Sequence, residues 1–245
     1  MPSPFLQGVR HVCFDKDGTL IDVHRYWAHN SRLRADALGE RFDLSTTDRA
    51  AVLEAMGVDA ASGRLNRRGP VGYAPRAVVL ETVVQFLAAR RVPATTVEVG
   101  ELFKRLDARQ QEADDYAIDL LPGVRECLAR LGAAGRVMTI YSSDRRDNVT
   151  RILDRLALRS FFTALVGGES VTKPKPDPEG FLIACREAGV PPAESAYVGD
   201  TLDDLHMSAR GGALRAIGVT TGLGTAEELA AESPFVVATL DSLVD

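Results

Sequence analysis

The sequence predicts an α/β fold in which a parallel sheet is interrupted early by an inserted helical domain. Three observations predict it. Residues 9–14 are predicted to form a short buried strand that leads into a pair of aspartates. Residues from about 22 to 118 show helical periodicity and little sign of strands. From residue 121 onward, helical segments alternate with short runs rich in Val, Ile and aromatic residues, and such units form a parallel sheet with helices on both faces.

The expected elements fall into two sets. In the sheet-forming part, strands are predicted at 9–14, 136–141, 162–166, 195–198 and 214–219, with helices at 147–156, 178–188 and 203–210. In the insertion, helices are predicted at 23–42, 48–56, 76–90 and 97–115, with a long Gly- and Pro-bearing connection at 62–73. The predicted organisation is a Rossmann-like α/β core domain, residues 1–21 and 119–245, and a helical cap domain, residues 22–118.

Composition limits the classes of function. The chain has 245 residues, 45% hydrophobic and 26% charged, with a net charge of -5, which is typical of a globular protein and gives no reason to expect nucleic acid as a partner. No apolar stretch is long enough to cross a bilayer, and the opening residues lack the features of a secretory signal, so we expect no membrane partner and a cytoplasmic location. No surface pattern distinguishes a monomer from a homodimer.

The most informative residues follow the first predicted strand. Asp15 and Asp17 would share one side if that strand continued through both, and Gly18 lets the backbone turn away after them. This arrangement places an acid beside a nucleophile. A divalent metal that prefers oxygen ligands, Mg²⁺ first, offsets the repulsion between the two carboxylates. The alternative is a solvated turn, because Asp and Gly both favour turns.

Polar residues also follow three later segments of the predicted core, where parallel sheets bind ligands. Ser142 can donate its hydroxyl to a phosphoryl oxygen, helped by backbone amides of the next turn. Ser143 and Asp144 are interpreted either as ligand contacts or as the N-cap of the following helix.

Lysine occurs only at positions 16, 104, 173 and 175, which makes each lysine informative. Lys173 lies in a proline-rich loop that would hold an ammonium group in place to neutralise phosphoryl oxygens and the carboxylate that attacks them. Lys175, two residues later, is interpreted as a solvated loop residue.

Asp200 is predicted at the tip of the strand before it and is a candidate metal ligand. Asp203 and Asp204 lie at the start of the next helix, where either could act as a cap, and Asp204 could also hold a water bound to the metal.

Together these motifs give the chain a family resemblance. Asp15-Lys16-Asp17-Gly18-Thr19, Ser142, Lys173-Pro174 and the run from Gly199 to Asp204 resemble the haloacid dehalogenase superfamily, in particular its phosphatase branch with a helical cap inserted after the first strand. The resemblance spans the whole predicted core domain.

The resemblance implies a Mg²⁺-dependent phosphatase acting on a small phosphomonoester, phosphoglycolate-like or sugar-phosphate-like. It implies that Asp15 attacks phosphorus and binds Mg²⁺, and that Asp17 protonates the departing alcohol and then activates water. The backbone carbonyl of Asp17 would also contact the metal, Asp200 would complete the metal site, and Asp204 would support it.

The same resemblance implies that Ser142, with Ser143 beside it, and Lys173 hold the phosphoryl group. The helical insertion would act as a lid that excludes water and selects the leaving group. Because phosphonate-cleaving relatives characteristically lack the second Asp and use a cap lysine, Asp17 favours a phosphate ester as substrate. Lys104, the only cap lysine, is interpreted as part of a solvated helix face.

Two other functions stay open at this point. A phosphosugar mutase of the same superfamily would share every core residue and differ in how its cap recognises a bisphosphate. A non-catalytic module that binds a phosphorylated ligand would share the fold, although the sequence shows no damage to the chemical set. In the cap, the 24–27 segment could form the rim of a pocket or pack helices, with packing favoured for Trp27, and Arg67, Arg68 and Tyr73 could contact an anionic leaving group or lie in a solvated loop.

Overall fold

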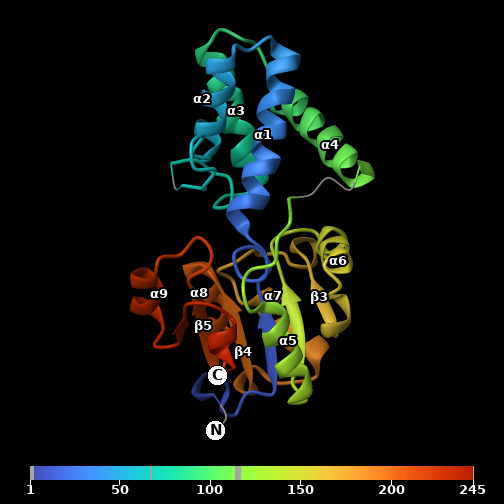
Figure 1. Ribbon diagram of the computed structural model, residues 1–245, viewed down its shortest axis with the longest axis vertical. Coiled ribbons are helices and arrows are strands. Elements are labelled where there is room, and N and C mark those ends of the chain that lie inside the picture. Colours follow the sequence, from blue (N-terminus) through green and yellow to red (C-terminus); the bar gives the residue numbers. More distant parts are fainter. Residues whose placement is uncertain (1–2, 67, 114–116, 245) are drawn as a thin grey trace. The chain divides into compact units, whose positions relative to one another are not determined.

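The computed structural model describes residues 3–66, 68–113 and 117–244. The chain divides into two compact units, Met1–Asp22 with Leu120–Asp245 (the core unit) and Val23–Asp119 (the cap unit). Figure 1 shows the first as a sheet with helices on its faces and the second as a group of helices. Each boundary lies one residue from its expected position.

The core unit is built on a parallel sheet. Its strands are β1 (His11–Phe14), β2 (Val137–Tyr141), β3 (Ala164–Val166), β4 (Ser195–Gly199), β5 (Arg215–Val219) and β6 (Val236–Val237), in the spatial order β3-β2-β1-β4-β5-β6. Every neighbouring pair is parallel, so the predicted α/β class is confirmed. The chain runs outward from β1 through β2 to β3 and then returns to β4 on the other side of β1. The switch point, where ligands bind in open α/β sheets, therefore lies beside β1.

Helices connect the strands of the core unit. They are α5 (Val124–Ala133), α6 (Arg146–Arg155), α7 (Glu179–Ala188), α8 (Leu202–Arg210) and α9 (Ala226–Glu232). Helix α7 packs on β1, β2 and β3, and α8 packs on β4 and β5, whereas α5 packs on β2 and α6 on β3. Because βαβ crossovers are right-handed, reversing the direction of travel along the sheet places α7 and α8 on the face opposite α5 and α6. Helices α5 and α9 and strand β6 were not predicted.

The face covered by α7 and α8 has an aromatic core beneath the candidate site. Cys13 of β1, Tyr141 of β2 and Tyr197 of β4 are fully buried there with Phe181 of α7 and Met207 of α8. The Phe181 and Tyr197 rings meet edge to face at 6.0 Å. Large buried aromatic side chains of this kind fix the ends of the strands that carry the polar residues.

Four helices form the cap unit: α1 (Val23–Phe42), α2 (Thr46–Met56), α3 (Arg76–Ala89) and α4 (Thr96–Ala113). Helix α1 packs on α2 and α4, and α3 packs on the same two helices. The predicted helix at 97–115 ends at Ala113, and its last two positions lie outside the described residues. Buried apolar side chains hold this unit together, among them Leu38, Met56, Val83, Leu87 and Phe103.

The structure also shows the environment of the cysteines and the lengths of the helices. Cys13, Cys127 and Cys185 are free and buried, as the sequence predicts. Among the described residues, no helix is both long enough and apolar enough to cross a membrane.

Candidate active site

Asp15 lies directly beyond β1 and is tied to the neighbouring strand. Its backbone N–H donates to the carbonyl of Val198 in β4 at 2.9 Å. The strand ends at Phe14, and the chain then folds back, with the Ile21 N–H donating to the Lys16 carbonyl at 3.1 Å. Asp15 and Asp17 therefore do not lie along one continuous strand, and each carboxylate has its own cationic partner.

The partner of Asp15 is Lys175. The Lys175 Nζ lies 2.6 Å from Asp15 Oδ1 and 2.7 Å from Asp204 Oδ1. The side chains of all three residues are at least nine-tenths buried. One ammonium group thus bridges two carboxylates, one directly beyond β1 and the other in the first turn of helix α8, Leu202–Arg210.

The structure corrects the predicted roles of the two loop lysines. The Lys173 side chain is 72% exposed and lies 4.0 Å from Asp177, away from the carboxylates of Asp15 and Asp204. Glu179 at the start of α7 accepts hydrogen bonds from the backbone N–H groups of Thr172 and Lys173, which fixes this segment at the loop surface. The interpretation of Lys175 as solvated is wrong. The sequence could not show which of the two lysines reaches the carboxylates, because both are the same residue type and lie two positions apart in one loop.

Aromatic rings support Lys175 from below. Its Nζ lies 5.1 Å from the centroid of the Tyr141 ring and 5.3 Å from that of Tyr197, within the range of cation–π attraction. Burial alone would lower the pKa of Lys175, but the charges of Asp15 and Asp204 outweigh burial and raise it above its ordinary value. Lys175 is therefore a fixed positive charge at neutral pH.

The partner of Asp17 is Lys16, whose side chain is fully buried. The Lys16 Nζ lies 2.8 Å from Asp17 Oδ1 and 3.5 Å from Asp144 Oδ2. Burial of Asp17 raises the pKa of its carboxyl group, while the Lys16 charge acts in the opposite direction. Lys16 thus fixes the position of the candidate acid by linking it to the segment that follows β2.

Ser142 is buried at the end of β2. Its N–H donates to the Val166 carbonyl at 3.1 Å, and its hydroxyl oxygen accepts from the Asp144 N–H at 3.2 Å. Ser143 is exposed. Helix α6 begins at Arg146 and its N-cap residue is Arg145, without a side-chain capping bond, so the alternative in which Ser143 or Asp144 caps this helix is wrong.

Asp200 and Asp204 belong to one turn beyond β4. Thr201 is the N-cap of α8 and forms a capping box with Asp204, whose Oδ2 accepts from the Thr201 hydroxyl at 2.6 Å. Asp204 thus caps the helix through Oδ2 and binds Lys175 through Oδ1, whereas Asp203 is exposed. Asp200 is buried, and its Oδ2 accepts from the Leu223 N–H at 2.7 Å.

Negative charge dominates the cluster. Burial, and then the charges of Asp204 and Asp15, raise the pKa of Asp200 well above its ordinary value. Burial also raises the pKa of Asp15 to about 7, although Lys175 opposes this shift. Lys175 pairs with both Asp15 and Asp204, and the carboxylates of Asp204 and Asp15 also act on Asp200, so the buried carboxyl groups of this cluster outnumber the ammonium that pairs with them in the described residues.

A divalent cation would balance this excess charge. Mg²⁺ is bound by one or two protein carboxylates, with waters and substrate oxygens completing its shell. The oxygen donors of Asp15 and Asp200 fit that requirement, with the Asp17 carbonyl as a third candidate. No group of three His, Cys, Asp or Glu side chains in the described parts of the chain is arranged to hold a metal without such help.

The candidate cap residues have partners within the cap unit. The Nδ1 of His24 accepts from the Leu65 N–H at 3.1 Å, Tyr26 is buried, and the Trp27 ring lies 5.6 Å from the Arg34 guanidinium. Lys104 is 76% exposed beside Glu101, as expected for a solvated helix face. In the 62–73 connection, Arg68 and Tyr73 are exposed and Arg67 lies outside the described residues.

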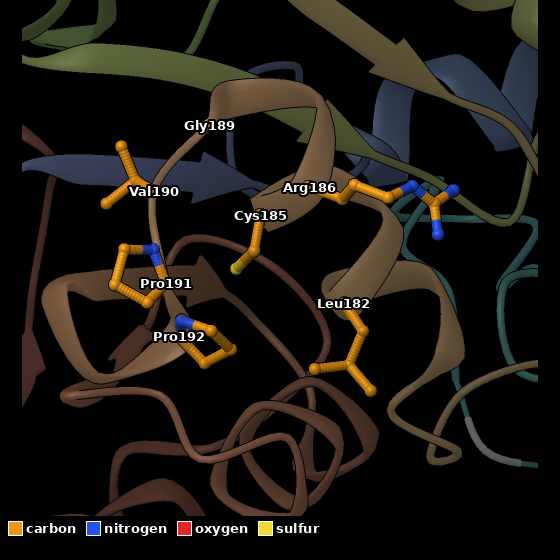
Figure 2. Close-up of a pocket in the computed structure, with 7 residues that line it drawn as sticks. All are labelled: Leu182, Cys185, Arg186, Gly189, Val190, Pro191 and Pro192. Carbon is orange, nitrogen blue, oxygen red and sulfur yellow. The ribbon is translucent and has the colours of Figure 1, made fainter.

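An apolar hollow of about 300 Å³ lies elsewhere in the core unit, between the end of α7 and the loop before β4. Figure 2 shows Leu182, Cys185 and Arg186 on one side of it and the 189–192 segment on the other. None of the charged residues described above lines it. The candidate site at the strand ends is therefore separate from this hollow.

Comparisons with known sequences give matches over most of the chain. The haloacid dehalogenase-like hydrolase family matches residues 9–212. The chain is 26% identical over 232 residues to the phosphoglycolate phosphatase of Salmonella choleraesuis (strain SC-B67), covering 95% of this chain and 89% of that protein.

Two solved structures share the fold. A protein of Haemophilus somnus 129pt, described as a predicted phosphoglycolate phosphatase, has a TM-score of 0.72 at 19% identity and covers 96% of each chain. The beta-phosphoglucomutase of Clostridium difficile has a TM-score of 0.64 at 18% identity and covers 96% of this chain and 93% of that one.

Proposed function

The chain belongs to the haloacid dehalogenase-like hydrolase family, and from this premise we propose that it is a Mg²⁺-dependent phosphatase that hydrolyses a small phosphomonoester through an aspartyl-phosphate intermediate. The observation that carries the proposal is the buried set of Asp15, Lys175, Asp200 and Asp204 at the switch point of the sheet. The full-length similarity to a phosphoglycolate phosphatase supports a small anionic ester as the substrate.

The first half of the reaction uses Asp15 and Asp17. A carboxylate oxygen of Asp15 attacks phosphorus, the bond between phosphorus and the ester oxygen breaks, and protonated Asp17 gives its proton to the leaving alcohol. Lys175, 2.6 Å from Asp15, neutralises charge on the phosphoryl oxygens as it transfers. Ser142 donates its hydroxyl to the same group.

The second half regenerates the enzyme. Asp17, now a carboxylate, takes a proton from water as the water oxygen attacks phosphorus, and the bond to Asp15 breaks to release phosphate. Lys16, 2.8 Å from Asp17, keeps this carboxylate in position between the two halves. Bound Mg²⁺, held by Asp15, Asp200 and the Asp17 carbonyl, would lower the repulsion between the carboxylates and the phosphoryl group.

The decisive experiment measures phosphate release. Native protein and Asp15→Asn are incubated with Mg²⁺ and a panel of monoesters that includes 2-phosphoglycolate and sugar monophosphates. We expect the substitution to lower kcat by at least about 10³-fold, because it removes the nucleophile. Asp203→Asn is the matched control, because Asp203 is exposed near the same site, and it should keep native activity.

Acid-quenched reactions with a ³²P-labelled substrate add an independent measurement. Label should appear on the native protein and be absent from Asp15→Asn. Equal phosphate release by both proteins would remove Asp15 as the nucleophile. Isomerisation of a sugar phosphate that requires a bisphosphate activator, without net phosphate release, would instead support the mutase. The mutase structure, at 18% identity, supports only the shared fold.

A further inference from the structure

The segment after β5, residues 220–224, encloses Asp200 although it is separated from it by a helix and a strand. The Leu223 N–H donates to Asp200 Oδ2 at 2.7 Å, and the Gly224 N–H donates to the Asp200 carbonyl at 2.9 Å. Both the side chain and the backbone of Asp200 are therefore held by one short segment. The amide hydrogen bond to Oδ2 therefore fixes the orientation of the Asp200 carboxylate.

The same segment holds the turn after β1. The Thr221 hydroxyl donates to the Gly18 carbonyl at 2.6 Å. Gly18 directly follows Asp17, whose own carbonyl is a candidate metal ligand. The hydroxyl of Thr221 and the amide of Leu223 thus join two elements that belong to different strands, β1 and β4.

The backbone around the Asp200 carboxylate is closely packed. A Cβ atom added to Gly222 would lie 1.9 Å from Asp200 Oδ2, and one added to Gly18 would lie 2.3 Å from the same oxygen. Gly18 also has a φ of +77°, a conformation that disfavours any side chain. Two backbone segments therefore close on one carboxylate oxygen from separate directions.

We infer that residues 220–224 form a clamp that sets the spacing between the Asp200 carboxylate and the Asp17 carbonyl, with Thr221 as its positioning residue. The inference rests on the proposed Mg²⁺ site. Mg²⁺ requires near-octahedral geometry with ligand distances of about 2.0–2.1 Å, so small displacements of one ligand against another weaken binding. Groups that orient metal ligands typically contribute about 10- to 100-fold to metal affinity.

The test measures Mg²⁺ binding by isothermal titration calorimetry on the full chain, without substrate. Thr221→Val keeps the shape of the side chain and removes the hydroxyl, and we expect the Kd for Mg²⁺ to rise by about 10- to 100-fold. Thr220→Val is the matched control, because the Thr220 hydroxyl lies 3.5 Å from the Ala238 carbonyl and not at the site. Its Kd should stay within about twofold of native.

A second variant separates positioning from general damage. Thr221→Ser keeps the hydroxyl and should bind Mg²⁺ with near-native affinity. In phosphate-release assays, raising the Mg²⁺ concentration should restore the kcat of Thr221→Val, which a misfolded protein would not show. Native Mg²⁺ affinity in Thr221→Val would overturn the clamp and leave the proposed function intact. Failure of the native protein to bind Mg²⁺ would overturn both.

Discussion

Strand β1 begins with one buried polar side chain, His11, and is followed directly by another, Asp15, and the two have opposite electrostatic surroundings. At its start, the His11 ring lies between neutral hydroxyls, with Nδ1 2.9 Å from Ser195 Oγ and Nε2 2.7 Å from Thr139 Oγ1. Just beyond its last residue, Asp15 lies among carboxylates that outnumber their ammonium partner. Burial lowers the pKa of His11 to about 4 and raises that of Asp15 to about 7.

The two groups lie four positions apart in the sequence, yet one links neighbouring strands and the other belongs to the candidate site. A buried polar group that is neutral and fully hydrogen-bonded costs little and specifies how neighbouring strands pair. A buried cluster with excess negative charge costs stability in the metal-free protein, and under the proposed function a bound cation would offset that cost. The carboxyl ends of the strands are therefore the less stable part of the sheet when no cation is bound.

The largest expected effect is at the charged end. Lys175→Met should lower kcat/KM for phosphate release by about 10²–10³-fold, because it removes a preorganised charge from the reacting group. Lys173→Met is the matched control and should stay within about twofold of native, since that side chain is 72% exposed.

Folding must be checked for this pair. Removing Lys175 leaves the Asp15 and Asp204 carboxylates without their shared partner, so circular dichroism should first establish that the variant is folded. Should Lys175→Met be unfolded, Lys175→Arg, which keeps the charge, should retain more activity than Lys175→Gln. A larger loss from Lys173→Met than from Lys175→Met would reverse our assignment of the two lysines.

The next largest effect is a loss of folding stability at acid pH, which arises from His11 at the start of β1. The unfolded chain protonates His11 near pH 6.5, and the folded protein does so only near pH 4, so the unfolded state binds more protons between these values. The contribution of neutral His11 is fully present above pH 6.5 and is lost as the pH falls toward 4, by roughly 3 kcal/mol in all.

Urea unfolding at a series of pH values measures this loss. The difference in unfolding free energy between native protein and His11→Gln should decrease as the pH falls from 7.5 to 4, because glutamine does not titrate. His206→Gln, at a partly exposed position on α8, is the comparison. A difference that stays constant with pH for His11→Gln would contradict this prediction, because it would mean that folding does not shift the pKa of His11.

The smallest expected effect is a gain in folding stability, whereas most substitutions lower stability. In EDTA at pH 7.5, Asp200→Asn should raise the free energy of unfolding by about 0.5–2 kcal/mol, because it removes one of the charges that burial and Asp204 disfavour. Saturating Mg²⁺ should remove this advantage by stabilising the native protein. Asp203→Asn should change stability by less than about 0.5 kcal/mol, and a loss of stability in Asp200→Asn would contradict the charge excess.

Much of the fold was predictable because local signals were strong. The predicted strands at 136–141 and 195–198 match β2 and β4 to within one residue at each end, and the helix at 23–42 matches α1. Helix α5 was missed although its buried residues recur at helical spacing, and β6 has only two residues and no signal of its own. Placement of polar residues after strands also located Asp15, Ser142 and Asp200 correctly in the fold.

Other parts of the site depended on contacts between distant segments. Nothing in the sequence around Lys16 indicates that its ammonium is fully buried between Asp17 and Asp144. The role of residues 220–224 was also missed, and its only sequence signal was the pair of glycines at 222 and 224 in a loop after a predicted strand.

The sequence by itself determined the fold class, the family and the strand ends at which the candidate site lies, because hydrophobic periodicity and short motifs are local properties of the chain. Only the tertiary structure decided which lysine meets Asp15, since Glu179 fixes the 172–173 backbone at the surface and leaves Lys175 to reach the carboxylates. Which groups neutralise a buried charge depends on distances across the fold, and those distances are not written in the spacing of residues along one loop.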